Sequence, residues 1–398
     1  MDALLALKKG ISRTPIGPSL RLAYARAFTP PRDAAPPPFG PPYGVAGLLS
    51  TPTGIGEAAR LSLRALEALG ETPVSFDVSE IIRTAGSVTV KETDAFEGPG
   101  TLVTFLNAPE TPKALQAMGR SRLAGKRVVG FWHWELPRVP AIWKGYGAFV
   151  HEVLAPSRFV ADAIRAVVDR PVRIVAHPVQ EPAVAPLDRS AFGLGPKDFV
   201  ALTVFNIDSG FHRKNPLGTI RAFVEAFGDR PDARLVIKTR VVSGHERERA
   251  ELRNAAGNHP GIVWLDQTMD ARDLAALMRS SDVLVSLHRS EGFGLVPSQA
   301  MWLGLPSVAT NWSSTTDFLN DENAALVDYR LVPVNDPFGV YTQRDEVWAE
   351  PDVGHAASWL RRLADDEPLR KRLGERARTD AARLFSLEAF ARAWRGAP

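Results

Sequence analysis

The sequence contains no cysteine, which excludes disulfide bonds, thiolate metal sites and a cysteine nucleophile. No stretch approaches the ~20 consecutive apolar residues that a membrane-spanning helix needs. The N-terminal segment has too short an apolar core, with lysines on the wrong side of it, for a secretory signal. The net charge is only +3, which does not by itself indicate a nucleic-acid partner. These absences predict a cytoplasmic protein.

Several catalytic signatures are missing as well. The sequence has no Asp-x-Asp pair of the kind that holds a divalent ion, and no histidines at the spacing, with a glutamate, of a metalloprotease helix. It also has no Gly-x-Ser-x-Gly elbow and no phosphate loop that ends in Gly-Lys-Ser/Thr. We therefore expect chemistry without a metal ion and without a bound cofactor.

The 398 residues, 45% of them hydrophobic and 23% charged, are enough for two globular domains. Short apolar runs alternate with amphipathic segments, a pattern typical of parallel sheets with helices on both faces. We expect Rossmann-like α/β domains at residues 43–180 and 190–355, a proline-rich link at 178–186, and final helices over 356–398. The expected strands are 43–50, 73–78, 101–106, 127–132, 148–155, 172–176, 199–205, 233–239, 262–265, 283–287 and 307–309.

The N-terminal residues 1–42 have a different composition. Residues 1–32 carry six lysines and arginines against one acid, together with several leucines, and seven of the thirteen residues 30–42 are proline. That proline density predicts a stiff, extended linker. The basic arm before it has two interpretations. It is either a solvated extension packed loosely on the body, or an amphipathic element that lies on an anionic membrane surface, at the inner face of the membrane.

The strongest local pattern runs from His288 to Thr310. A buried strand is followed by a polar loop with two glycines, and a helix is expected to begin near Pro297. Glycines let the backbone approach a ligand closely, and the N–H groups of a helix N-terminus suit a diphosphate. Glu291 is better placed to accept hydrogen bonds from sugar hydroxyls, and Gln299 can reach a second set of hydroxyls.

A second pattern spans residues 205–216. It follows an expected strand and leads into a helix that Asn215 caps and Pro216 opens. Arg213 and Lys214 lie directly before the cap, where two cations can neutralise a departing diphosphate. A solvated basic turn is the alternative interpretation.

Two segments of the first domain also carry candidate residues. Gly54 and Gly56 link a strand to a helix, although a Gly-x-Gly pair is weak evidence without a third glycine. Aromatic residues at 131–134 end another strand beside His133 and Glu135, which could orient a hydroxyl. A core aromatic cluster with a hydrogen-bonded histidine explains this segment equally well.

Together these segments resemble retaining family 4 glycosyltransferases (glycosyl transferases group 1). The resemblance covers the second domain nearly throughout and the first more loosely, and it implies a GT-B fold, with two Rossmann-like domains facing across a cleft. It implies that Glu291 contacts the donor sugar, within a donor-binding stretch that continues through Gly292, Phe293, Gly294 and Leu295. Gln299 stands where the family has a second acid, which typically holds the ribose.

The resemblance also implies roles for the basic residues and for residues of the first domain. Lys214 corresponds to a lysine of the family. The family usually also has an arginine several residues earlier, but this sequence has Asn206 and Asp208 in that region. Arg213 or Lys238 would then take the place of that arginine. The loop with Gly54 and Gly56 would face the donor phosphate, and related proteins have Trp-Glu-Leu at the position of Glu135. The final helices would return to the first domain.

The sequence therefore predicts a metal-independent, retaining transfer of a hexose from a nucleotide-diphosphate sugar to a hydroxyl of a glycan or a lipid-linked acceptor. The sequence shows no pair of carboxylates of the kind that glycosidases use, so a double displacement has no evident nucleophile. A phosphorylase on the same scaffold would need a pyridoxal-phosphate lysine that the sequence does not reveal. The alternative is a non-catalytic sugar-nucleotide-binding or scaffold subunit. Gln299, which replaces the family's second acid, is the residue that would indicate such a loss of activity.

Overall fold

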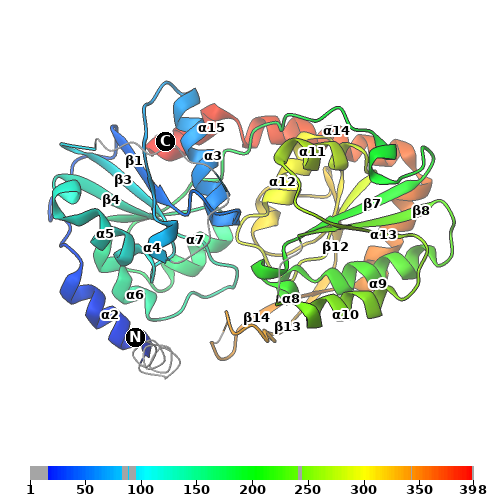
Figure 1. Cartoon of the computed structure of the whole chain (residues 1–398), viewed down its shortest axis with the longest axis horizontal. Helices are drawn as coiled ribbons and strands as arrows, with labels where there is room; N and C mark the ends of the chain where they lie inside the picture. The colour runs from blue at the N-terminus through cyan, green and yellow to red at the C-terminus, as the bar shows by residue number, and fades with distance from the viewer. Residues whose placement is uncertain (1–16, 83–87, 89–95, 241–243, 342, 397–398) are drawn as a thin grey trace. The chain divides into compact units, whose positions relative to one another are not determined.

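Two parallel sheets form the framework of the chain (Figure 1). The computed structural model describes residues 17–82, 88, 96–240, 244–341 and 343–396. One unit comprises the described chain up to Trp134, then Arg138–Pro178 and the end from Phe390. The other comprises Glu135–Pro137 and Val179–Ala389. The border at Pro178 lies where the proline-rich link was expected, but the short segment Glu135–Pro137 groups with the second unit.

The first unit contains a six-stranded sheet in the order β2-β1-β3-β4-β5-β6, and its neighbouring strands pair in parallel. Its central strands β1 and β3 are buried along their whole length, as expected for a sheet covered on both faces. The strands are β1 (Tyr43–Gly47), β2 (Val74–Asp77), β3 (Gly100–Phe105), β4 (Lys126–Phe131), β5 (Glu152–Ala155) and β6 (Val172–Ile174). The helices are α2 (Gly17–Phe28), α3 (Gly54–Ala68), α4 (Ser79–Ile82), α5 (Thr111–Leu123), α6 (Trp143–Tyr146) and α7 (Arg158–Arg165).

The second unit repeats this plan with the order β12-β11-β10-β7-β8-β9. Its strands are β7 (Phe199–Val204), β8 (Ala233–Thr239), β9 (Ile262–Asp266), β10 (Val283–Ser286), β11 (Ser307–Thr310) and β12 (Ala324–Val327). Its helices are α8 (Phe211–Lys214), α9 (Pro216–Phe227), α10 (Glu246–Ala256), α11 (Ala271–Arg279), α12 (Leu295–Trp302), α13 (Val353–Asp365) and α14 (Glu367–Leu384). A two-stranded antiparallel hairpin, β13 (Tyr329–Pro333) with β14 (Val347–Pro351), precedes α13.

Alternate residues along the strands of the second sheet belong to two different hydrophobic clusters. Ala201 and Leu235 belong to a cluster that includes residues of α9, α10 and α13, whereas Leu202 and Val236 belong to a cluster with residues of α11 and α12. Successive side chains of a strand point to opposite faces, so helices cover both faces of this sheet. The predicted α/β class with two doubly wound domains is confirmed.

Local capping follows the sequence signals. Ser157 accepts a hydrogen bond from the N–H of Val160 at the start of α7, and Asn215 does the same for Gly218 at the start of α9. Asn215 has a φ of 51°, a left-handed conformation that asparagine tolerates better than most residues. Strands β12, β13 and β14 were not among the expected strands, because their segments are short or partly exposed.

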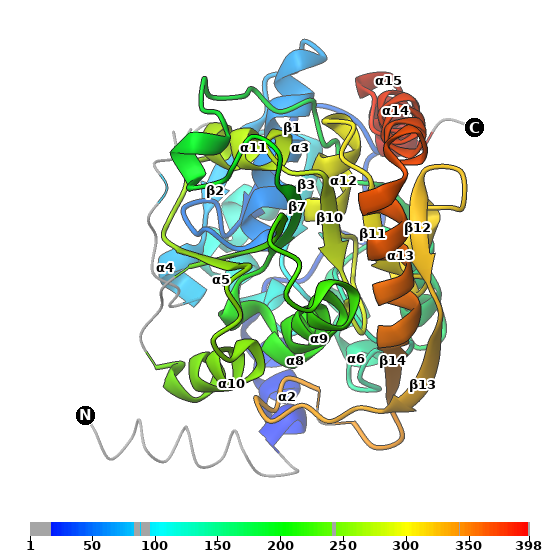
Figure 2. The same ribbon diagram turned by 90° about the vertical axis from the view of Figure 1, so that its right-hand side faces the viewer.

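The C-terminal helices depart from the expected arrangement. Helices α13 and α14 belong to the second unit, and Figure 2 shows α13 beside β11 and β12. Leu360, Leu363 and Leu373 are buried in the core of the second unit. A Cβ added to Gly374 of α14 would lie 2.1 Å from the carbonyl oxygen of Gly304, so α14 approaches that turn backbone to backbone. The domain therefore extends past residue 355, because these helices complete its core.

Among the C-terminal helices that the structure describes, only α15 (Leu387–Arg395) contributes residues to the first unit, from Phe390 onward. Trp394 is 1% exposed, and its ring centroid lies 5.8 Å from the centroids of both Phe39 and Tyr43. Arg173 donates to the carbonyl oxygens of Ala393 and Trp394 at 2.9 and 3.1 Å. The return to the first domain is thus made by the packing of Trp394 and by the hydrogen bonds of Arg173.

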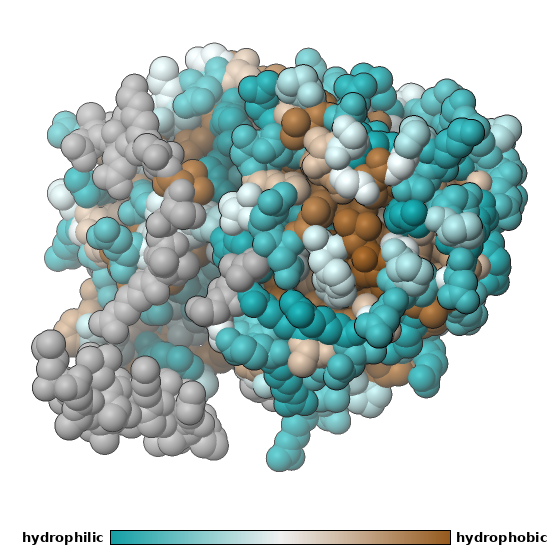
Figure 3. Space-filling view, turned by 45° about the vertical axis from the view of Figure 1, so that its right-hand side comes forward, coloured by the Kyte–Doolittle hydropathy of each residue, from teal (hydrophilic) through white to brown (hydrophobic). Residues whose placement is uncertain are grey.

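The basic arm and the proline segment are partly described. Residues 1–16, with Lys8, Lys9 and Arg13, lie outside the described residues. Residues 17–28 form helix α2, and the proline segment is held on the first unit, with Arg127 Nε donating to Pro37 O at 2.8 Å. No helix in the described part of the chain is long and apolar enough to cross a membrane. Figure 3 shows hydrophilic side chains over most of the face it presents, in keeping with a mean hydropathy of −0.10.

Candidate active site

Two loops of the second unit emerge at the same edge of its sheet. One follows β7 and holds Arg213 and Lys214, and the other follows β10 and holds Glu291. Because β7 and β10 are neighbouring parallel strands, their carboxyl ends lie side by side. Ligands of open α/β sheets bind outside this edge. The sheet therefore brings together the two patterns that stood out in the sequence.

Glu291 forms an ion cluster with the two cations. Its Oε2 accepts from Arg213 Nη1 at 3.0 Å, and its Oε1 accepts from Lys214 Nζ. Arg213 also donates to Ser290 O at 2.8 Å and to Ser209 O at 2.7 Å, so its guanidinium joins both loops. The side chains of Arg213 and Glu291 are 6% and 8% exposed, whereas that of Lys214 is 21% exposed. Lys214 is the cation of the cluster that solvent reaches most easily.

Burial and neighbouring charges shift the pKa values of Glu291 and Lys214 in opposite directions. Burial on its own raises the pKa of Glu291, but the charges of Lys214 and Arg213 outweigh it and lower that pKa to about 2. Burial lowers the pKa of Lys214, and the attraction of Glu291 only partly offsets it. Burial also lowers the pKa of the neighbouring His288, to about 4. At neutral pH the cluster therefore holds an ionised carboxylate, two cations and a neutral imidazole.

Backbone hydrogen bonds hold the two loops in register. The N–H of Arg289 donates to Arg213 O at 2.7 Å, and Asn215 Nδ2 donates to Leu287 O at 3.0 Å. Ser313 Oγ accepts from the N–H of Glu291 at 2.9 Å, and Ser314 Oγ donates to Glu291 O at 2.7 Å. The Glu291 backbone is thus fixed on both sides, which pre-organises the carboxylate.

The predicted glycines of the loop after β10, Gly292 and Gly294, differ in conformation and in surroundings. Gly294 has a φ of 101°, and a Cβ there would lie 2.8 Å from Thr315 Cγ2, so both conformation and space require glycine. Helix α12 begins at Leu295, two residues earlier than expected, so the N–H groups of its first turn follow Gly294 directly. Gly292 is buried in the same loop, beside Glu291.

Phe293 and Gln299 have unlike surroundings. Phe293 is buried, with its ring centroid 5.6 Å from that of Phe318 and 6.0 Å from that of Phe385, so its side chain packs in the interior. Gln299 is half-buried on α12, and its side-chain amide makes no hydrogen bond to another described residue. Packing therefore explains the phenylalanine at position 293, whereas the contacts of the described residues do not explain the amide of Gln299.

Lys238, one of the two candidates to substitute for the family's arginine, is engaged elsewhere. Its Nζ donates to Thr239 O at 3.0 Å and to Gln267 O at 2.8 Å, and burial lowers its pKa. Arg213 contacts Glu291 directly, so of the two candidates Arg213 is the one placed in the cluster.

Sequence reasoning missed Tyr341, which lies in the segment between β13 and β14. Its hydroxyl donates to Glu135 Oε2 at 3.0 Å, and Asp336 holds the backbone by accepting from the N–H groups of Val340 and Tyr341. Burial raises the pKa of Tyr341 well above its ordinary value, and its charge would interact with that of Arg213. No motif or spacing in the sequence singled out this tyrosine.

The hairpin is attached to the glutamate loop by its second strand. Arg289 donates from Nε and Nη2 to the two carboxylate oxygens of Glu350 at 2.6 and 3.1 Å, and the N–H of Ala349 donates to Arg289 O. A bidentate arginine–carboxylate pair fixes orientation as well as distance. The position of Tyr341 is therefore coupled to the loop of Glu291.

In the first unit, His133 pairs with His177. Their Nε2 atoms lie 3.1 Å apart, and both rings stack with Phe131. Burial lowers the pKa of His133 to about 4 and that of His177 well below its ordinary value, so both are neutral at neutral pH. Asn107 Oδ1 accepts from the N–H of His133 at 2.8 Å. This is the aromatic cluster with a hydrogen-bonded histidine that the sequence left open as an interpretation.

The glycines of the first loop are explained in part by packing. Thr53 caps α3 by accepting from the N–H of Gly56, and a Cβ at Gly56 would lie only 2.4 Å from Leu48 O. Gly54 has open space around the position of a Cβ. The close approach of two backbone segments therefore requires Gly56 whether or not a ligand binds there. Across the described ranges, no group of three or more histidines and carboxylates converges to hold a metal ion.

The low pKa of Glu291 makes a prediction about acid stability. A carboxyl group whose pKa is lower in the folded state stabilises the fold above its unfolded pKa, and this contribution disappears as the pH falls through the folded pKa. The free-energy difference between wild type and Glu291→Gln should therefore be largest above pH about 4.5 and shrink toward pH 2, by at most about 3 kcal/mol. Urea unfolding at pH 7, 5, 4 and 3 measures it. A difference that does not change with pH would contradict the ionised cluster.

The described fold defines the class of this protein. Two parallel-sheet α/β domains of the GT-B type match HepE from Anabaena with a TM-score of 0.63, at 13% identity, over 87% of this chain and 96% of that chain. WaaG matches with a TM-score of 0.58, at 16% identity, over 88% and 98%. TarM from S. aureus matches with a TM-score of 0.56, at 12% identity, over 74% and 54%.

Residues 209–343, which contain the whole ion cluster, match the family described as Glycosyl transferases group 1. The chain is also 28% identical over 191 residues to a D-inositol 3-phosphate glycosyltransferase from Nocardioides sp.. That match covers 45% of this chain and spans only 37% of the length of the relative, and the chain spans about half of TarM, 54%. The segment of the second unit that holds the cluster is thus similar to the Glycosyl transferases group 1 family.

Proposed function

We propose that this protein is a retaining glycosyltransferase of family 4, which transfers a hexose from a nucleotide-diphosphate sugar to a hydroxyl group without a metal ion. The observation that carries the proposal is the cluster of Glu291, Lys214 and Arg213 at the carboxyl edge of a parallel sheet, within the segment similar to the Glycosyl transferases group 1 family. The cluster offers what such a donor needs, namely cations for a diphosphate and a carboxylate for sugar hydroxyls.

The cations act on the leaving group. When the bond to the sugar breaks, negative charge grows on the diphosphate, and Lys214 stabilises it from the solvent-accessible side of the cluster. Arg213 is buried and held by two carbonyl groups, so it orients Glu291 and adds a fixed positive charge. The N–H groups at the start of α12 supply further donors for the phosphate oxygens.

Glu291 binds the sugar while it remains ionised. Its pKa of about 2 keeps it charged at neutral pH, so it accepts hydrogen bonds from hydroxyls and does not serve as a general acid. A double displacement needs a carboxylate nucleophile at the reacting carbon, whereas both carboxylate oxygens of Glu291 are held by Arg213 and Lys214. We therefore favour departure and attack on the same face of the sugar, which retains its configuration.

The acceptor we propose is a glycan or a lipid-linked molecule. His133 and Glu135 are the candidates to orient its hydroxyl, with Tyr341 as a partner of Glu135. A lipid-linked acceptor would be reached at an anionic membrane surface, which residues 1–32 would contact. Such a site of action is peripheral, at the inner face of the membrane, and polysaccharide biosynthesis is the process it would serve.

The ligands of the similar structures indicate the first nucleotide to test. HepE was crystallised with UDP and glucose, and TarM with UDP. In a thermal-shift panel of UDP-, GDP- and ADP-sugars, we expect one nucleotide class to raise the melting temperature. At a hundredfold excess over Kd, binding stabilises the fold by about 2.7 kcal/mol, or on the order of 5–10 °C for a domain of this size.

The same panel, followed by an assay for nucleotide release, tests the alternative of a binding or scaffold subunit. The observation that favours that alternative is Gln299, an uncharged residue where the family has an acid. Donor binding without release of nucleotide on any acceptor would support it. The absence of any thermal shift would contradict both functions.

A further inference from the structure

Helix α2 is docked on the first unit by one face. Leu22 and Ala25 are buried, and a Cβ added to Gly145 would lie 2.3 Å from Leu22 Cδ2, so the leucine packs directly on the backbone of α6. Gln116 of α5 donates to Thr29 Oγ1 at 2.9 Å, just past the end of the helix. Helix α2 is therefore part of the folded unit and not a loose extension.

The outward face of the same helix is apolar too. Leu20, Tyr24 and Phe28 are 49%, 59% and 64% exposed. Their spacing of four residues places them in one stripe, and the rings of Tyr24 and Phe28 lie 4.5 Å apart. Proteins rarely leave a contiguous apolar stripe in water unless it binds something.

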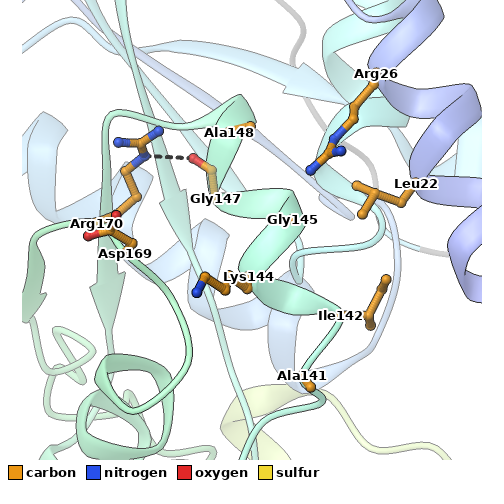
Figure 4. Close-up of a pocket in the computed structure, with 10 residues that line it drawn as sticks. All are labelled: Leu22, Arg26, Ala141, Ile142, Lys144, Gly145, Gly147, Ala148, Asp169 and Arg170. Carbon is orange, nitrogen blue, oxygen red and sulfur yellow. Dashed lines mark hydrogen bonds between the residues drawn. The ribbon is translucent and has the colours of Figure 1, made fainter.

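The surroundings of this stripe are basic. A hollow of about 470 Å³ beside α2 is lined by Arg26, Lys144 and Arg170, with Asp169 as the acidic residue (Figure 4). Arg26 and Arg170 flank the segment Gly145–Ala148 in Figure 4. In the described part of the chain, no ion pair joins any of these three cations to a carboxylate.

Two further observations extend the positive charge. Arg32 lies next to the hollow, where its Nε donates to Ala148 O at 3.0 Å, and burial together with the charge of Arg170 lowers its pKa. The sequence has no acid between Asp2 and Asp33. An apolar stripe beside cations that outnumber the one acid of the hollow, Asp169, is complementary to a surface with anionic headgroups above an apolar layer.

We propose that this face of the first unit docks on an anionic phospholipid membrane. Leu20, Tyr24 and Phe28 enter the boundary between headgroups and acyl chains, and the hollow of Arg26, Lys144 and Arg170 holds a lipid phosphate. The idea that docking brings the protein to a lipid-linked acceptor rests on the proposed function. The docking itself depends on α2 and its surroundings alone.

The test is co-sedimentation of the full chain with vesicles of phosphatidylcholine, with and without about 30% phosphatidylglycerol. We expect binding to the anionic vesicles that weakens at higher salt. The triple variant Leu20→Ser/Tyr24→Ser/Phe28→Ser should bind at least about tenfold more weakly. Arg26→Glu/Lys144→Glu should lose about fivefold for each cation removed. Leu331→Ser is the matched control, since Leu331 is also 49% exposed but belongs to the second unit.

Four outcomes would overturn the proposal. The first is that the triple variant binds vesicles as wild type does, and the second is that both vesicle types bind the protein equally. The third is that inorganic phosphate at millimolar concentration releases the protein, because release would assign the hollow to free phosphate. The fourth, measured by light scattering, is a dimer that the triple variant abolishes, which would assign the stripe to a second copy of the chain. Donor-induced thermal shifts of each variant are read separately, so failure of the proposed function stays distinguishable from failure of docking.

Discussion

Replacing Glu291 by glutamine is expected to reduce turnover by about 10²–10³-fold, the loss typical for removal of one charge-stabilising contact in an active site. Glutamine keeps the size of the side chain and an acceptor oxygen, but it removes the negative charge between Arg213 and Lys214. The chain should still fold, with a loss of about 1–3 kcal/mol in the free energy of unfolding from the weakened charged hydrogen bonds. Nucleotide release per folded molecule and urea unfolding measure the two effects.

Asp282→Asn is the matched control for this experiment. Asp282 is also a largely buried carboxylate of the second unit, and its Oδ2 accepts from Arg189 at 2.8 Å. It lies at the amino end of β10, whereas Glu291 follows the carboxyl end. We expect Asp282→Asn to lower stability while turnover of the folded protein stays unchanged. Near-normal turnover in Glu291→Gln would remove this glutamate from the mechanism.

Replacing Lys214 by methionine is expected to have an effect of similar size, about 10²–10³-fold in turnover, because the departing diphosphate loses its most accessible cation. Methionine fills nearly the same volume and leaves Arg213 as the partner of Glu291. The thermal shift caused by the donor should also become smaller. Since Lys214 stabilises the ionised carboxylate, the variant should raise the pKa of Glu291 toward its ordinary value.

Lys238→Met distinguishes between the two lysines near this sheet edge. Its Nζ binds the carbonyl groups of Thr239 and Gln267, so its removal leaves buried acceptors without a partner and should lower stability by about 1–3 kcal/mol. Turnover of the folded variant should remain close to that of wild type. A strong catalytic loss in Lys238→Met together with a weak one in Lys214→Met would reverse the roles that the contacts indicate.

Much of the fold could be predicted because its signals are local. Helix α9 begins at Pro216 and Asn215 caps it, both as expected, and strand β8 has the expected bounds of 233–239. Apolar periodicity and capping act within a few residues, so they can be read directly along the chain. The predictions were poorer for short or partly exposed strands such as β13, where neither burial nor alternation is strong.

The C-terminal helices show where local signals end. The amphipathic pattern identified α13 and α14, but an apolar face does not state which core it completes. The family resemblance favoured the first domain, whereas the leucines of these helices fill the core of the second. Helix α2 was missed for a related reason, since its apolar residues divide between a docked face and an exposed stripe.

The sequence by itself determined the α/β class, the two-domain plan and the candidate role of Glu291 and Lys214, because strand ends and glycine loops mark the carboxyl edge of a parallel sheet. Only the tertiary structure decided that Arg213, and not Lys238, pairs with Glu291, 78 residues away. It also decided that His133 pairs with His177 and Tyr341 with Glu135. These contacts join residues distant along the chain, and side-chain partners in a buried site are chosen by packing and desolvation, which no local pattern records.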